Sequence, residues 1–166
     1  RYIDDFEDIS TNVDVKNNIP VNNKVFIVHG HDGELKEKVA RRLEQQGIEA
    51  IILSEQANRG RTIIEKIEAY SDVHVAIALF TQDDIGAVKE EKGNEKYRAR
   101  QNVVFEAGYF VGYLGRENVI MIAEENLEIP GDLSGMVYTT KDNWEFEMLK
   151  ELKAAGMKID MNKLIG

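Results

Sequence analysis

The sequence contains no cysteine, and this absence excludes disulfide bonds, cysteine-ligated zinc sites and thiol nucleophiles. It also has no signal peptide and no apolar run near the roughly 20 residues that cross a bilayer. We therefore expect a cytoplasmic protein. Basic residues are fewer than acidic ones: the sequence has 21 Lys and Arg and 30 Asp and Glu, so its formal net charge is -9. An acidic surface repels phosphate backbones, which argues against broad nucleic-acid binding.

The 166 residues, 43% of them hydrophobic, suffice for one domain of the commonest size. Residues 1–23 are polar and rich in Asp and Asn, and Pro20 lies near their end. This composition predicts a linker or an arm from a preceding domain. The first residue is Arg1 rather than Met, so we expect a piece of a longer protein. The domain itself is predicted to span residues 24–166.

From residue 24 onward, short apolar segments alternate with amphipathic ones. Strands are predicted at 24–28, 48–53, 73–80, 118–123 and 136–139, and helices at 34–46, 63–70, 99–114 and 144–155. Thr62 and Glu65 form a capping-box pattern at the start of the second helix. The long polar segment 81–97 is predicted to be a mobile surface loop.

This alternation predicts an α/β fold, with a five-stranded parallel sheet covered by helices on both faces. We expect the flavodoxin-like strand order 2-1-3-4-5. In such sheets ligands bind beyond the carboxyl ends of the strands, where the strand order reverses. A site is therefore expected near residues 28–32 and near Thr81 and Asp84.

The turn after the first strand, HGHDG at residues 29–33, lacks the glycine spacing of a dinucleotide fingerprint, and no Walker A loop is present. Thr81 stands where a response-regulator receiver has its acidic phosphoacceptor. His29 and His31 have a spacing found in zinc hydrolases, but His74 opens a strand at the other end, so no metal is expected. Two interpretations of the turn stay open: a histidine bonded to backbone, or a direct ligand role.

The helix predicted at 99–114 carries the most information. At about 100° per residue, one face is apolar and forms the expected core face: Val103, Val104, Ala107, Phe110, Val111 and Leu114. A second face is polar and aromatic: Asn102, Phe105, Glu106, Tyr109 and Tyr113. Glu106 is the only acid of the helix and lies between the two faces. A half-buried carboxylate costs free energy unless it is paired or its pKa shifts, so Glu106 is a candidate functional residue.

An alternative interpretation of the same helix is structural. Glu106 would then pair with Arg98 or Arg100, and the aromatic stripe would pack against another helix or a second subunit.

Four stretches together resemble the TIR-like domain of bacterial predicted nucleotide-binding proteins, a family that includes TIR effectors of CBASS and Pycsar antiphage systems. They are KVFIVHGHD (24–32), NRGRTIIEKIE (58–68), RARQNVVFEAGYFVGYLGRENV (98–119) and IPGDLSGMVY (129–138). The resemblance implies a flavodoxin-like fold and cleavage of NAD⁺ to nicotinamide and ADP-ribose, sometimes cyclised. NAD⁺ is then the substrate, and no cofactor is implied. The resemblance also implies that Glu106 corresponds to the catalytic glutamate that related TIR enzymes have on the helix after the third strand. It also implies an upstream sensor domain, and self-association through the loop from Ser54 to Arg61.

The chemistry is compatible with a single carboxylate. Glycosidases usually need two, one of them as the acid that protonates the leaving group. Nicotinamide leaves NAD⁺ as a neutral molecule from a cationic pyridinium, so no general acid is required. Glu106 would orient the ribose hydroxyls and stabilise the developing positive charge.

Other residues are expected to contact the substrate. Phe105 or Tyr109 would stack on a flat ring. The pyrophosphate needs hydrogen-bond donors, from the turn amides at residues 30–32 or from arginines 59, 61, 98 and 100. Each of these arginines, taken singly, is also compatible with a surface ion pair. The full expected set is His29, Gly30, His31, Asp32, Arg61, Thr81, Asp84, Arg100, Asn102, Phe105 and Tyr109.

Two further functions stay open beside the enzyme. The domain is alternatively a non-catalytic TIR scaffold that self-associates, or a nucleotide-binding module that senses a second messenger.

Overall fold

The computed structural model describes residues 21–31 and 33–164. Most of the arm predicted at 1–23, and Asp32 in the turn, therefore lie outside the described residues. At the start of the described chain, the side-chain amide of Asn22 donates a hydrogen bond to the backbone oxygen of Asp72 at 3.2 Å. Asn23 donates to the backbone oxygen of Gly47. Residues 22 and 23 thus lie against the domain.

Five parallel strands form the main sheet in the order β2-β1-β3-β6-β8. They are β1 (Lys24–Val28), β2 (Glu49–Ile52), β3 (Val75–Phe80), β6 (Val119–Ala123) and β8 (Val137–Thr139). This confirms the predicted α/β fold and the order of its five principal strands. Every residue of β3 and β6 is buried, because helices cover both faces of the sheet and neither side of these strands faces water.

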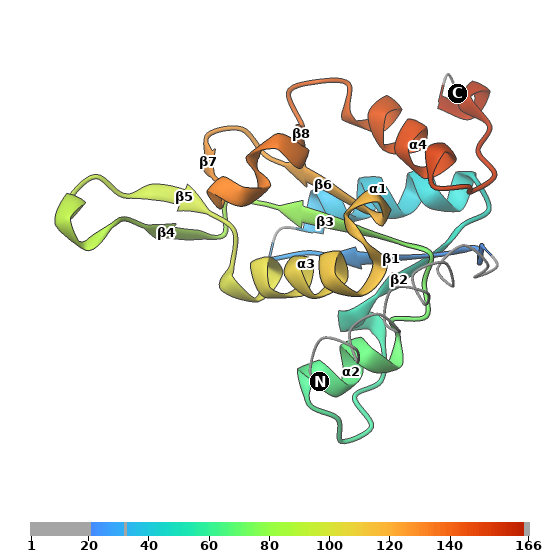
Figure 1. Ribbon diagram of the computed structural model, residues 1–166, viewed down its shortest axis with the longest axis horizontal. Helices are drawn as coiled ribbons and strands as arrows, with labels where there is room; N and C mark the ends of the chain where they lie inside the picture. Colours follow the sequence, from blue (N-terminus) through green and yellow to red (C-terminus); the bar gives the residue numbers. More distant parts are fainter. Residues whose placement is uncertain (1–20, 32, 165–166) are drawn as a thin grey trace, which may run out of the picture.

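Helices pack on the sheet in two layers, as Figure 1 shows. The helices are α1 (Gly33–Gln45), α2 (Ile63–Ala69), α3 (Gln101–Leu114) and α4 (Trp144–Ala154). Val39 of α1 and Leu149 of α4 belong to one core cluster, and Ile67 of α2 and Phe110 of α3 belong to the other. Within the described part of the chain, no helix is both long enough and apolar enough to span a membrane.

The helix ends follow the local signals that the sequence contains. The Thr62 hydroxyl accepts a hydrogen bond from the Glu65 amide at 3.3 Å, and the Glu65 carboxylate accepts one from the Thr62 amide at 2.7 Å. The predicted capping box is therefore confirmed. Gly47 and Gly156 follow α1 and α4 with φ of 74° and 94°, a backbone conformation that favours glycine at a helix end.

The predicted core face of α3 is confirmed. Val103, Ala107 and Phe110 are buried in the cluster between α3 and the sheet. Val104, Val111 and Leu114 are partly buried against the same cluster. The ring of Phe110 lies 4.7 Å from that of Phe26, centroid to centroid.

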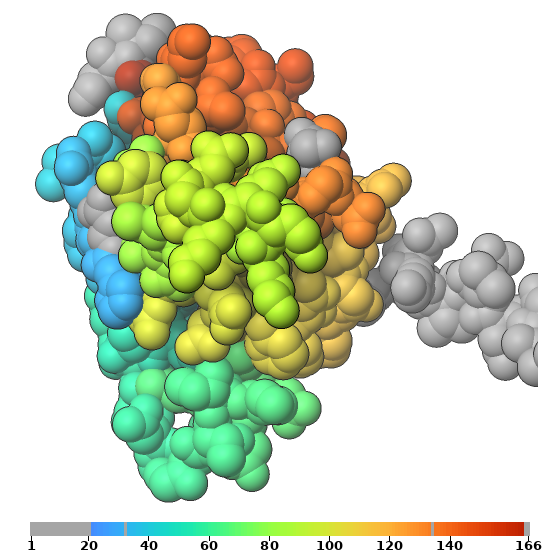
Figure 2. All heavy atoms as spheres, turned by 90° about the vertical axis from the view of Figure 1, so that its left-hand side faces the viewer, coloured from blue at the N-terminus to red at the C-terminus, as the bar shows by residue number. Residues whose placement is uncertain are grey.

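The segment 81–97, predicted to be a mobile surface loop, lies at the surface but contains regular structure. The segment forms an antiparallel hairpin of β4 (Asp84–Gly86) and β5 (Lys96–Arg98), and β7 (Leu127–Glu128) extends it to a three-stranded sheet. The hairpin projects from the domain in Figure 1 and stands in front in Figure 2. Strands of three residues are too short for a clear alternation of apolar side chains. Their pairing also depends on a third strand about 30 residues away.

Phe110→Ala is predicted to lower the free energy of unfolding by about 3–5 kcal/mol, because the ring is fully buried and leaves a cavity. Urea denaturation of the purified chain measures this. Phe105→Ala on the same helix is the matched control, since Phe105 is 56% exposed and should cost about 0.5 kcal/mol or less. Equal losses in the two variants would contradict the assigned core face.

Candidate active site

A cavity of about 220 Å³ lies at the carboxyl-terminal ends of β1 and β2. Parallel strands end at the same edge of the sheet, so the segments that follow β1 and β2 meet there with the starts of α2 and α3. The lining residues are Ile27, His29, Gly30, Leu53, Ser54, Ile63, Lys66, Arg100 and Glu106. A larger hollow of about 780 Å³ beside the hairpin is lined by none of the residues expected to bind substrate.

Among the described residues, Glu106 is the one acidic residue that lines this cavity. Burial in the cavity wall raises the pKa of the Glu106 carboxyl to about 7, and the nearby positive charge of Arg100 opposes that rise. Among the described residues, no ion pair joins Glu106 to Arg98 or to Arg100. The alternative in which Glu106 pairs with Arg98 or Arg100 is therefore not formed.

His29 is held in one orientation at the end of β1. Its Nδ1 lies 2.9 Å from the carbonyl oxygen of Gly30, which can only accept, so Nδ1 carries the proton. The other nitrogen, Nε2, then accepts from the Ser54 hydroxyl at 3.4 Å. Burial lowers the pKa of His29, which keeps the imidazole neutral at pH 7. The interpretation of a histidine bonded to backbone is confirmed, and the same ring lines the cavity.

Asp83 supports the turn after β1 from the neighbouring strand end. Its carboxylate accepts a hydrogen bond from the His31 amide at 3.1 Å and another from the Thr81 hydroxyl at 2.8 Å. A Cβ on Gly30 would lie 1.8 Å from an oxygen of Asp83, so only glycine allows this approach. Asp83 was missed in the sequence, where it is one of two adjacent acids in a polar segment.

The structure brings together four of the residues predicted to form the site: His29, Gly30, Arg100 and Glu106. The other described members do not line the cavity: His31, Arg61, Thr81, Asp84, Asn102, Phe105 and Tyr109. Thr81 is 1% exposed and its hydroxyl is used by Asp83. Asp32 lies outside the described residues.

The aromatic side chains of α3 pack mainly on one another. Tyr109 is stacked on Tyr113 at 5.7 Å between ring centroids and meets Phe110 edge-on at 5.3 Å. Phe105 is exposed. Phe105 and Tyr109 therefore do not provide the expected stacking surface for a substrate ring. The apolar side chains Ile63, from α2, and Leu53, just after β2, line the cavity instead.

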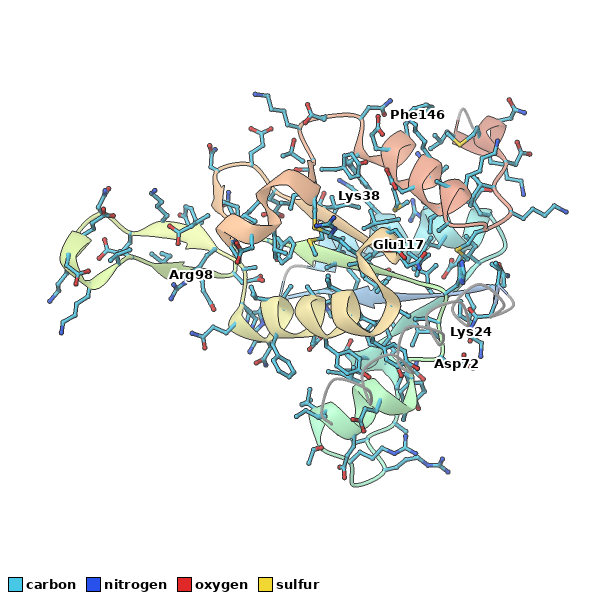
Figure 3. All side chains as sticks on the ribbon, in the orientation of Figure 1. Lys24, Lys38, Asp72, Arg98, Glu117 and Phe146 are labelled. Atoms are coloured by element: carbon cyan, nitrogen blue, oxygen red, sulfur yellow. The ribbon has the colours of Figure 1, made fainter. Side chains whose placement is uncertain are left out.

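Of the four arginines considered as pyrophosphate donors, Arg100 alone lines the cavity. Arg59 and Arg61 are exposed in the loop before α2. Arg98 ends β5 and lies on the hairpin, near its junction with α3 (Figure 3), where its guanidinium packs over Gly86. Its Nε is buried without a hydrogen-bond partner among the described residues.

Lys66 is the charged lining residue that sequence reasoning missed. It is 5% exposed and lies on the buried side of α2 with Ile67. A signal for it exists in the sequence. The capping box sets where α2 begins, and a spacing of three to four residues then puts Ile63, Lys66, Ile67 and Tyr70 on one face. In the described part of the chain, no three His, Asp or Glu side chains gather as a metal site requires.

Comparison with known protein families matches residues 24–143 to the family described as CAP12/Pycsar effector protein, TIR domain. This chain belongs to that TIR-domain family. The TIR domain is 47% identical over 150 residues to uncharacterized protein YuaY of Escherichia coli (strain K12), covering 88% of this chain and 50% of that protein. It is 39% identical over 140 residues to protein tirC of Dictyostelium discoideum, covering 78% of this chain and 68% of that protein.

A third relative is CD-NTase-associated protein 12 of Sphingobacterium faecium, 33% identical over 79 residues. That alignment covers 46% of this chain and 24% of the Sphingobacterium protein. The chain thus spans half the length of YuaY and about a quarter of the Sphingobacterium protein.

Glu106→Gln is predicted to stabilise the TIR domain at pH 8 and to leave its stability unchanged near pH 4. Folding raises the pKa of Glu106 from 4.5 to about 7. As pH rises through this window, the unfolded state loses its proton first, so the folded state loses relative stability. We expect a gain of about 1–3 kcal/mol at pH 8, since the carboxyl is partly screened by solvent.

Urea denaturation at the two pH values measures this effect. Glu44→Gln is the matched control, because Glu44 is exposed on α1 and should change little at either pH. A Glu106→Gln difference that does not depend on pH would show that the carboxyl is not desolvated.

Proposed function

We propose that this TIR domain cleaves NAD⁺ to nicotinamide and ADP-ribose, with Glu106 beside the reacting ribose. The observation that carries the proposal is the Glu106 carboxyl in a cavity at the carboxyl-terminal ends of β1 and β2. It is partly desolvated and forms no ion pair among the described residues. In such surroundings a carboxylate attracts a developing positive charge more strongly than it does in water. The family match supports the assignment.

In the proposed reaction the bond between the ribose C1′ and the nicotinamide nitrogen breaks. The electron pair stays on the nicotinamide nitrogen, and the ring leaves as a neutral molecule. The ribose takes up the positive charge as an oxocarbenium-like species, which the Glu106 carboxylate stabilises. Water then adds to C1′ and loses a proton, which completes ADP-ribose.

The groups around Glu106 suit these steps. Ile63 and Leu53 make an apolar wall against which the departing nicotinamide can lie. The neutral His29 adds a polar group without a competing charge. The carboxylate itself accepts a hydrogen bond from a ribose hydroxyl, and this bond strengthens as charge develops.

We further propose that self-association through the loop from Ser54 to Arg61 controls the activity. Ser54 lines the cavity, so a movement of this loop changes the shape of the site. The loop is exposed at its tip, where Arg59 and Gly60 both have positive φ, 51° and 72°. The competent state of an isolated domain is then a minor population, and its apparent activity falls in proportion. By analogy with the Pycsar effectors named among its family, the domain would act in antiphage defence.

Glu106→Gln is predicted to lower nicotinamide release from NAD⁺ by at least about 100-fold, because the amide does not carry the negative charge that stabilises the transition state. The assay uses the purified chain at high concentration, with a crowding agent to drive assembly. Glu44→Gln is the control and should retain full activity. Near-normal nicotinamide release by the Glu106→Gln protein would exclude Glu106 as the catalytic residue. Absence of nicotinamide release from every protein, the wild type included, would favour a non-catalytic scaffold.

The kcat/KM for NAD⁺ is predicted to rise with pH through about 7 and then to level off. Glu106 acts as the carboxylate, and burial raises its pKa to about 7 in the free protein. Initial rates of nicotinamide release between pH 5 and 9 (about two units either side of that value) measure the profile. A profile that is flat, or that falls with rising pH through 7, would contradict the assigned ionisation state.

A further inference from the structure

Lys66 is a buried cation without an anionic partner among residues 21–31 and 33–164. It is 5% exposed, and its Nζ donates a hydrogen bond to the side-chain oxygen of Asn58 at 2.8 Å. None of the ion pairs in the described part of the chain includes it. An ammonium group has three donors, and a buried charge is costly unless it is paired. Its position in the cavity wall makes a bound anion the natural partner.

Arg100 lines the same cavity from the start of α3. It precedes α3 as the N-cap residue, and its guanidinium takes part in no ion pair among the described residues. The start of α3 adds the partial positive charge of a helix N-terminus. The cavity therefore has two cationic side chains, Lys66 and Arg100, from two different helices.

The charge of the cavity is opposite to that of the chain. Among the described lining residues, Lys66 and Arg100 stand against one carboxyl, and His29 is neutral, whereas the chain carries a formal net charge of -9. An acidic protein repels nucleotides over most of its surface, so a local excess of positive charge concentrates an anionic ligand at this one place.

The size of the cavity limits which part of a nucleotide it holds. Sites that enclose a whole ligand measure roughly 300–1,000 Å³, and this cavity measures about 220 Å³. It therefore encloses only part of a dinucleotide. If the reacting ribose lies beside Glu106, the phosphate nearest to the cations is the one on that same ribose.

We propose that Lys66 and Arg100 bind the 5′-phosphate of the ribose whose glycosidic bond is cleaved beside Glu106. This inference rests on the proposed function and deepens it. The site would recognise phosphorylated nicotinamide ribosides as a class, with NAD⁺ and nicotinamide mononucleotide as members. The unphosphorylated nicotinamide riboside lacks the recognised group, and the adenylate half of NAD⁺ lies outside the cavity.

Calorimetry in the Glu106→Gln background tests binding without turnover. The titrants are nicotinamide mononucleotide and nicotinamide riboside. The first should bind about tenfold or more tightly than the second, as a charge-assisted phosphate contact requires. Adding Lys66→Gln should remove most of this preference and leave riboside binding unchanged, and Lys66→Arg should keep part of it. Lys153→Gln, an exposed lysine of α4, is the matched control and should change neither.

The outcomes separate the subsite from its alternatives. An equal loss for both titrants in Lys66→Gln would mean that Lys66 only holds Asn58 and its loop in place, and would overturn the proposal. So would a parent protein that binds the mononucleotide no more tightly than the riboside. A phosphate preference that depends on Lys66 supports the subsite even if the wild-type chain releases no nicotinamide. In that case the proposed cleavage fails and the binding site stands.

Discussion

The pairing of β1 between two parallel neighbours is the constraint on which the site depends. Helices cover both of its faces, and residues 25–28 have no exposed surface, so its backbone groups must bond to β2 and β3. Parallel pairing then brings the carboxyl ends of all three strands to one edge. The helices that follow, α2 and α3, both begin at this edge, and Lys66 and Glu106 reach the cavity from their first two turns.

Two of the three charged residues described in the cavity wall, Glu106 and Lys66, lie where local rules favour apolar ones. Glu106 occupies the margin of the buried face of α3, and Lys66 occupies the inward face of α2. Each departs from the pattern that stabilises its own helix, and the desolvation of Glu106 opposes folding above neutral pH. Such conflicts between local pattern and burial are expected at functional sites, where binding or catalysis requires the destabilising group. In an acidic chain, the two cations also make this edge distinct from the rest of the surface.

The main sheet was predictable because its central strands are buried on both sides. Continuous apolar runs therefore mark them in the sequence, and polar, glycine-containing segments separate them from the helices. The capping box was equally predictable, since its hydrogen bonds join residues three apart. The hairpin was not, because its strands carry one large apolar side chain each and are completed by β7, which comes after α3 and β6. Pairing over such a separation leaves no local periodicity to detect.

The sequence by itself determined the fold and the one carboxyl that stands out on α3, because helix periodicity and strand burial act over a few neighbouring residues. The family followed from the resemblance of four stretches, at 24–32, 58–68, 98–119 and 129–138. Only the tertiary structure decided which side chains share a cavity with Glu106. It brought in Lys66 and left out Phe105, whose ring is exposed on the same helix. The Thr81 hydroxyl is also not available to a ligand, because it donates a hydrogen bond to the Asp83 carboxylate. The same carboxylate holds the turn after β1 through the His31 amide. The physical reason is that a cavity forms where several segments converge. Its lining depends on how the loops between elements direct each side chain, which no single segment encodes.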